Sequence, residues 1–259
     1  SSCVQCSECG DVVVCPNCYL VDIDVEACSE FGVTVWHPDP GSQKYYATTK
    51  DEFAINAVLS LMNPLVRASD PLEYDWSASM SRDVHGRRLS ILAANGGGRR
   101  LAEVFRSLGC QVRTAEIGTK EPFDWHVESH QQPSVNELWE WSEVCVMMDG
   151  ATIDLGAVLE ETRHAPELVV TMSSTLEVPI ESLVQALENG VLRTIVLDMV
   201  PNAWRDPARI AATRAGIEQL KAVPGCVFTP EMSIISEGSM QRSYQQVYSA
   251  LVDIASRLH

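Results

Sequence analysis

The chain has 259 residues, which is long enough for one large domain or for two modest ones with a core each. Its 35 acidic and 19 basic residues give a formal net charge of -16, which disfavours nucleic acid and anionic membrane surfaces as direct ligands. Although 46% of the residues are hydrophobic, no apolar run approaches the roughly 18 residues of a membrane helix, so we expect no membrane span.

The N-terminal region is rich in cysteine. The chain has nine cysteines, an odd number, and most lie in the first 28 residues, which favours an intracellular reducing compartment over a disulfide scaffold. Cys6 with Cys9, and Cys15 with Cys18, form two C-x-x-C pairs that resemble zinc knuckles. Because the pairs are close together and the second overlaps a predicted strand, we expect reduced cysteines and no metal, with zinc as the alternative.

Short apolar and helical patterns begin near the N-terminus. They predict a strand, a helix and a second strand, at residues 12–15, 24–31 and 33–36. Turn-forming residues at 37–42 then mark a boundary between two parts of the chain. A long helix is expected at 49–67, in which Pro64 predicts a kink or an early end.

Strands and helices alternate regularly after this helix. Short apolar runs predict six strands, at 89–93, 111–115, 144–148, 168–172, 194–197 and 226–229. Helical patterns are found at 98–108, 136–141, 155–161, 180–188, 208–221 and 239–258. Short apolar strands that alternate with helices are buried on both faces, so the expected fold class is α/β with a doubly wound parallel sheet.

The segment 90–102 has the strand, glycine-rich turn and helix start of a dinucleotide fingerprint. Ala93, Asn95 and Gly98 occupy the three glycine positions of G-x-G-x-x-G, so only the third glycine is kept and binding is expected to be weakened. Glu116 follows at the end of the next strand, where a carboxylate accepts the ribose hydroxyls of NAD; the alternative is a solvated glutamate. The candidate cofactor-binding residues here are Asn95, Gly96, Gly97, Gly98 and Glu116.

The segments together resemble the D-2-hydroxy-acid dehydrogenase family, which includes the C-terminal-binding protein corepressors. Residues 21–33 are similar to the family segment DNIDVEACTERGI, and residues 169–183 align without gaps to LINTARGGLVDEEAL. Residues 196–199 resemble ALDV, and residues 228–230 resemble the LTP that precedes the family's catalytic histidine.

The resemblance implies a Rossmann-type nucleotide lobe, a flavodoxin-like substrate lobe built from both chain ends, and a dimer through the nucleotide lobes. We expect residues 47–239 to form the dinucleotide-binding lobe and residues 1–46 with 240–259 to form a substrate lobe. The usual first units of that lobe are missing before Val12, so we expect it to be truncated.

The family's catalytic positions are changed in this chain. The arginine, glutamate and histidine positions hold Ser174, Ala203 and Glu231, so no catalytic residue is expected. Serine cannot form the charge-assisted clamp that a guanidinium gives a carboxylate, and an ionised glutamate lacks the proton needed to reduce a ketone. Asp198 matches a position near the nicotinamide and is a further candidate for holding the cofactor; alternatively it caps the turn before Pro201.

Two hypotheses for function follow from these positions. The first is a catalytically degraded, dehydrogenase-like scaffold, adaptor or assembly subunit that binds protein partners or forms a homodimer and retains NAD(H). The alternative is a divergent NAD-dependent oxidoreductase that acts on a small 2-hydroxy or 2-oxo acid through Glu231. His126 and His130 have a helical metal-ligand spacing but are expected in a solvated loop.

Overall fold

The structure is a computed structural model that describes residues 2–6, 10–15, 23–37, 44–63, 82–94, 97–117, 133–148, 151–201, 204 and 210–256. The chain divides into two compact units. Residues 1–49 with 234–259 form the smaller unit, and residues 50–233 form the larger one. The expected assignment of these parts to a substrate lobe and a nucleotide lobe stays a prediction.

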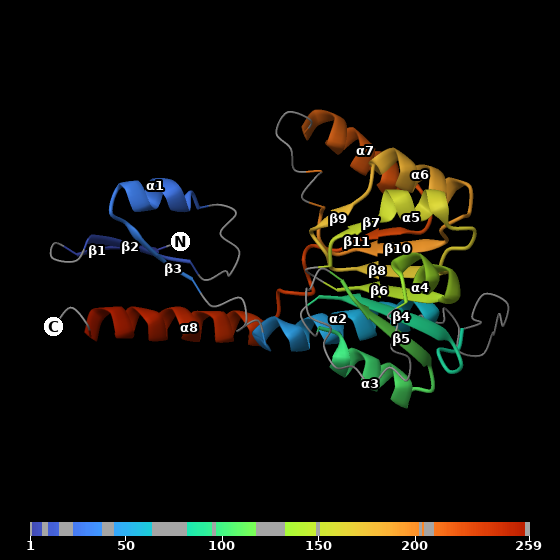
Figure 1. The fold of residues 1–259 in the computed structure, drawn as a ribbon, viewed down its shortest axis with the longest axis horizontal. Coiled ribbons are helices and arrows are strands. Elements are labelled where there is room, and N and C mark those ends of the chain that lie inside the picture. The colour runs from blue at the N-terminus through green and yellow to red at the C-terminus, as the bar shows by residue number, and fades with distance from the viewer. Residues whose placement is uncertain are drawn as a thin grey trace, which may run out of the picture. The chain divides into compact units, whose positions relative to one another are not determined.

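The larger unit is built on a parallel sheet of six strands in the order β11-β10-β8-β6-β4-β5 (Figure 1). The strands are β4 (Arg88–Ala93), β5 (Gln111–Glu116), β6 (Val144–Met147), β8 (Leu168–Thr171), β10 (Thr194–Leu197) and β11 (Cys226–Phe228). Every residue of β6 and β8 is buried, which explains why these strands are continuous apolar runs in the sequence. The predicted α/β class and doubly wound parallel sheet are confirmed.

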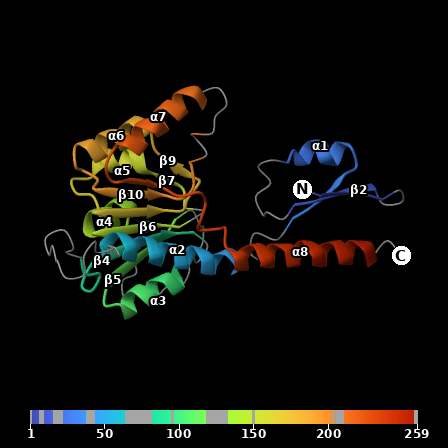
Figure 2. The ribbon, with the colours of Figure 1, turned by 180° about the vertical axis from the view of Figure 1, so that it is seen from behind.

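Helices cover both faces of this sheet. They are α2 (Lys44–Met62, which enters the larger unit at Lys50), α3 (Arg99–Ser107), α4 (Val135–Trp141), α5 (Leu155–Glu161), α6 (Ile180–Glu188) and α7 (Ile210–Ala222). Helices α2 and α3 cover one face and α4 to α7 cover the other (Figures 1 and 2). Side chains of α2 and α3 share one buried cluster with alternate strand residues, and side chains of α4 to α7 share the other. Two cores therefore sandwich the sheet.

Two features of the larger unit differ from the sequence expectations. Helix α2 begins at Lys44 and ends at Met62, earlier at both ends than the predicted 49–67. A short parallel pair of strands, β7 (Ile153–Asp154) and β9 (Leu176–Glu177), was not predicted, because two residues carry no periodicity.

The smaller unit contains a three-stranded sheet and two helices. Strand β2 (Gly10–Val14) pairs antiparallel with β1 (Ser2–Cys6) and parallel with β3 (Thr34–Trp36). Helix α1 (Val25–Glu30) is capped by Asp24, whose carboxylate accepts a hydrogen bond from the backbone N–H of Ala27 at 2.9 Å. Helix α8 (Glu237–Ser256) completes the unit, and within the described residues no helix is long and apolar enough to cross a membrane.

Strand β1 lies in the cysteine-rich region and was not predicted as a strand. Cys9 and Cys18 lie outside the described residues, so the alternative of a zinc knuckle is not tested. Cys15 is described: its thiol is buried, and its backbone N–H donates to the carbonyl of Trp36 at 2.8 Å. This bond continues the pairing of β2 with β3 by one residue.

Candidate functional site

The candidate site lies at the carboxyl ends of the parallel strands in the larger unit. The chain runs from β4 to the edge strand β5 and then crosses back to β6 on the other side of β4. Such a reversal of strand order leaves a crevice at the carboxyl ends of the strands, where open α/β sheets bind ligands. Three of the sequence candidates, Asn95, Gly96 and Ala203, lie outside the described residues.

The glycine-rich turn joins β4 to helix α3. Gly98 has φ +83°, and a Cβ atom added there would lie 2.7 Å from Cγ2 of Ile91. A side chain at Gly97 would meet the carbonyl oxygen of Ala94 at 3.2 Å. Glycine is therefore required at 98 both by the left-handed backbone and by the close packing of α3 on β4, which is the role of the third glycine in a dinucleotide fingerprint.

Glu116 lies beside this turn at the end of β5. It is paired in register with Ala93, and the N–H of the next residue, Ile117, donates to the carbonyl of Ala93 at 2.7 Å. Its half-buried carboxylate is thus attached to a strand end that is fixed against β4. A glycine cradle next to a strand-end carboxylate has the chemistry that an NAD molecule requires, with backbone N–H groups for the pyrophosphate and an acceptor for the ribose.

Asp198 follows β10 and is 1% exposed. Its carboxylate accepts hydrogen bonds from the hydroxyl of Thr229, from the backbone N–H of Met232 at 2.8 Å and from that of Ser233 at 3.0 Å. These partners belong to the loop after β11; part of the turn that follows Pro201 lies outside the described residues, so both roles considered for Asp198 stay predictions. The carboxylate holds the neighbouring loop.

Glu231 is the central residue of that loop. It is half-buried and has φ +55°, the only left-handed backbone of a non-glycine residue in the described part of the chain. Its N–H donates to the carbonyl of Asp198 at 3.0 Å and to that of Thr229 at 3.1 Å. Left-handed backbone at a side-chain-bearing residue is strained and persists only when surrounding contacts hold it.

Ser174 follows β8 and lies between two anchored residues. The hydroxyls of Ser173 and Thr175 donate to the carbonyl of Ala151 at 2.9 and 3.1 Å and lie 2.9 Å from each other. Strands β8, β10 and β11 are neighbours in the sheet, so Ser174, Asp198 and Glu231 follow the carboxyl ends of three adjacent strands. Ser174 itself is short and uncharged, so it cannot form the bidentate contact that a guanidinium makes with a carboxylate.

A buried carboxyl group near the glycine turn was not singled out as functional from the sequence. Asp51 in α2 is 5% exposed, and this burial raises its pKa to about 6, while the nearby guanidinium of Arg100 lowers it. A signal was available, since Asp51 shares one helical face with Ala54, Val58 and Met62, all of them buried. Arg100 is the second residue of α3, next to the turn.

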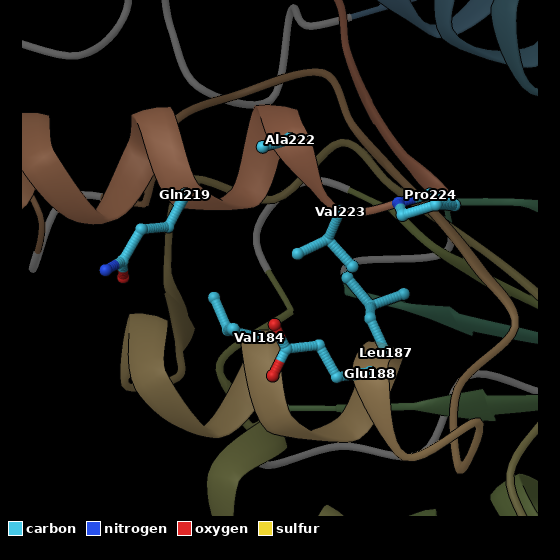
Figure 3. Close-up of a pocket in the computed structure, with 7 residues that line it drawn as sticks. All are labelled: Val184, Leu187, Glu188, Gln219, Ala222, Val223 and Pro224. Carbon is cyan, nitrogen blue, oxygen red and sulfur yellow. The ribbon is translucent and has the colours of Figure 1, made fainter.

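A groove of about 700 Å³ lies elsewhere, between α6 and α7 (Figure 3). In the close-up, Val184, Leu187 and Glu188 extend from α6, while Gln219 and Val223 belong to the α7 side. The C-terminal parts of both helices lead into the amino ends of β10 and β11. The groove therefore lies at the amino ends of the strands, and the candidate site lies at their carboxyl ends.

Comparisons with known proteins give a consistent group of relatives. No family model matches the chain. The D-3-phosphoglycerate dehydrogenase of Haemophilus influenzae is 22% identical over 235 residues, which cover 87% of this chain and 54% of that protein. The chain thus spans about half the length of the curated relative that it matches.

Solved structures with a similar fold are also dehydrogenases. A D-2-hydroxyisocaproate dehydrogenase aligns with a TM-score of 0.72 at 16% identity, over 96% of this chain and 77% of its own. The D-lactate dehydrogenase of Aquifex aeolicus, solved with NAD and lactic acid, gives 0.66 at 14% identity over 95% and 77%. The NAD-dependent formate dehydrogenase of Staphylococcus aureus, solved with NAD, gives 0.64 at 17% identity over 95% and 71%.

Proposed function

Starting from a chain that is related to the D-isomer-specific 2-hydroxyacid dehydrogenases and has their fold, we propose that this protein is a catalytically degraded member of that group which binds NAD(H). It acts as a scaffold, an adaptor or a subunit of an assembly, through protein partners or a second copy of its larger unit. The observation that carries the proposal is that Ser174 and Glu231, which the family resemblance aligns with the catalytic arginine and histidine, follow the carboxyl ends of β8 and β11.

Cofactor binding is supported by the glycine turn and the strand-end carboxylate. The turn at residues 95–98 would hold the pyrophosphate, although the N–H of Gly97 donates to the carbonyl of Ala94 at 3.0 Å, and Glu116 would accept the ribose hydroxyls. A carboxylate at Glu116 repels the additional phosphate of NADP, so NAD(H) is the expected form. When bound, NAD(H) supplies or accepts a hydride; the binding and orientation are what the protein contributes.

Loss of catalysis is supported by the chemistry of the replaced residues. Reduction of a 2-oxo acid needs a cation for its carboxylate and a donor for the proton on the new hydroxyl. Ser174 offers no charge, and an ionised Glu231 offers no proton and repels the substrate. Losing a general acid lowers the rate by roughly 100- to 10,000-fold, and losing the clamp disorients the substrate as well.

The strained backbone of Glu231 favours a second candidate function. Residues held in left-handed conformations cluster at working sites. With φ +55° and two backbone hydrogen bonds, Glu231 is held as a catalytic or binding residue would be. The alternative is therefore a divergent NAD-dependent oxidoreductase that acts on a small 2-hydroxy or 2-oxo acid and uses Glu231 in place of a histidine.

One pair of measurements separates these functions. Calorimetric titration with NADH and NADPH tests the cofactor: we expect saturable binding of NADH that is at least about tenfold tighter than that of NADPH. NADH oxidation is then followed with a panel of small 2-oxo acids at saturating cofactor. Binding without turnover supports the proposal, whereas steady turnover that Glu231→Gln abolishes establishes the alternative. Absence of NADH binding refutes both.

A further inference from the structure

Three successive backbone N–H groups of the loop after β11 donate to one residue. The N–H of Glu231 donates to the carbonyl oxygen of Asp198 at 3.0 Å. The next two, of Met232 and Ser233, donate to the two carboxylate oxygens of Asp198, at 2.8 and 3.0 Å. The hydroxyl of Thr229 donates to Oδ1 as well, so the carboxylate of Asp198 accepts hydrogen bonds from both ends of residues 229–233.

Two of these N–H groups, those of Met232 and Ser233, converge on the carboxylate, as the donors of an anion-binding nest do, while the N–H of Glu231 binds carbonyl oxygens beside it. Successive N–H groups converge into a concave donor site when left-handed and right-handed residues alternate, and Glu231 supplies the left-handed residue at φ +55°. Hydrogen bonds from N–H groups to an ionised acceptor are roughly twice as strong as neutral ones. A carboxylate that is 1% exposed requires such donors, because burial of an unpaired charge is strongly unfavourable.

We propose that Asp198 is a positioning residue: its carboxylate permanently fills this nest and so fixes Glu231 at the ends of the strands. The family resemblance implies that Asp198 contacts the cofactor directly. Its four described acceptor contacts with residues 229–233 assign it to the loop instead. The orientation of Glu231, whatever its role, then depends on Asp198.

The chain offers a matched control for this proposal. The hydroxyl of Ser233 is fully buried and has no hydrogen-bond partner among the residues that the structure describes, while the N–H of the same residue donates to Asp198. Ser233→Ala therefore removes a side-chain group next to the nest and leaves every donor of the nest in place. Asp198→Ala removes the occupant and leaves a space of the size of a formate ion.

Amide hydrogen exchange on the full chain tests the nest directly. In Asp198→Ala we expect exchange at residues 231–233 to rise about tenfold or more relative to the amides of β8, and sodium formate, but not sodium chloride of equal ionic strength, to reverse it. Ser233→Ala should exchange as the wild type does. Unchanged exchange in Asp198→Ala, or equal effects of formate and chloride, would overturn the proposal.

If Asp198→Ala does not fold, Asp198→Asn gives the same decision. Its amide keeps one acceptor and turns one N–H group toward another, so exchange at 231–233 should still rise, and formate should have no effect because the space is filled. Wild-type exchange in Asp198→Asn would count against the proposal.

A second readout rests on the proposed function and uses NADH and ADP-ribose, which lacks the nicotinamide. A positioning role predicts that Asp198→Asn changes both affinities by the same factor. A loss of about tenfold or more for NADH alone would make Asp198 a direct cofactor contact and overturn the proposal. If the wild type binds neither compound, the proposed function fails, and the exchange experiment alone decides the role of Asp198.

Discussion

Replacing Gly98 by alanine tests the packing of α3 on β4, on which the dinucleotide turn depends. Two penalties arise at this position. The backbone at φ +83° is left-handed, which costs a residue with a Cβ about 1–2 kcal/mol. The new methyl group would also lie 2.7 Å from Cγ2 of Ile91, well inside van der Waals contact.

The two penalties can be separated with a matched variant. Gly190 also has a left-handed backbone, at φ +69°, but nothing lies within 4 Å of a Cβ added there. Gly190→Ala should therefore show the conformational penalty alone, about 1–2 kcal/mol. Forcing a methyl group into a filled core costs typically about 1–3 kcal/mol more, so Gly98→Ala should lower the free energy of unfolding by about 2–5 kcal/mol in total.

Urea unfolding followed by tryptophan fluorescence measures both variants, and thermal unfolding gives an independent comparison. For a unit of this size, about 1 kcal/mol shifts the melting temperature by about 2–4 °C, so Gly98→Ala should melt several degrees below Gly190→Ala. NADH should also stabilise Gly98→Ala less than it stabilises Gly190→Ala, since only the first alters the turn. Equal destabilisation of the two variants would refute the close approach of α3 to β4.

Three further changes have defined outcomes. Burial raises the pKa of Asp51 to about 6, so protonation of this group stabilises the folded state below pH 4, and that stabilisation is lost as the pH rises through about 6. Asp51→Asn should remove this loss. Urea unfolding should then show the variant more stable than the wild type by on the order of 1–3 kcal/mol at pH 7.5, with little difference near pH 4. An Asp51→Asn variant less stable than the wild type at pH 7.5 would mean that the attraction of Arg100 outweighs burial. Burial raises the pKa of Cys145 to about 12, so its thiol should not react with an alkylating reagent at pH 8 until the protein unfolds. Half-buried Cys28 should be alkylated in the folded protein. Mass spectrometry of peptides measures both. Ser134→Ala removes the acceptor of the capping box of α4 and should lower the free energy of unfolding by about 1 kcal/mol; no change would show that the cap does not contribute.

The parallel sheet was predictable because its strands are buried on both faces and are bounded by turn residues. Helices α5 and α6 were predicted with the bounds that the structure gives them. The start of α5 is fixed by Asp154, which accepts a hydrogen bond from the N–H of Ala157 at 2.9 Å. The end of α6 is marked by Gly190, whose left-handed backbone closes the helix. Local signals of this kind are read from a single sequence without knowledge of tertiary contacts.

The partners of the site residues were not predictable in the same way. The contacts of Asp198 with residues 229–233 join residues more than thirty positions apart, and no periodic pattern in the sequence predicts them. The family resemblance aligns Glu231 with a histidine, but the left-handed backbone of Glu231 accompanies hydrogen bonds to Asp198 and Thr229 that the sequence does not reveal. Tertiary contacts decide such features, whereas the composition of the turn at Gly98 predicts its own geometry.

The anchoring of the segment around Ser174 has a consequence for engineering at this position. Two neighbouring hydroxyls anchor the backbone of Ser174 to Ala151, and the pairing of β9 with β7 begins two residues later. The support for a side chain at this position is therefore intact, although the side chain itself is short and uncharged. A side chain introduced by Ser174→Arg would therefore extend from a backbone that the hydroxyls of Ser173 and Thr175 already anchor to Ala151.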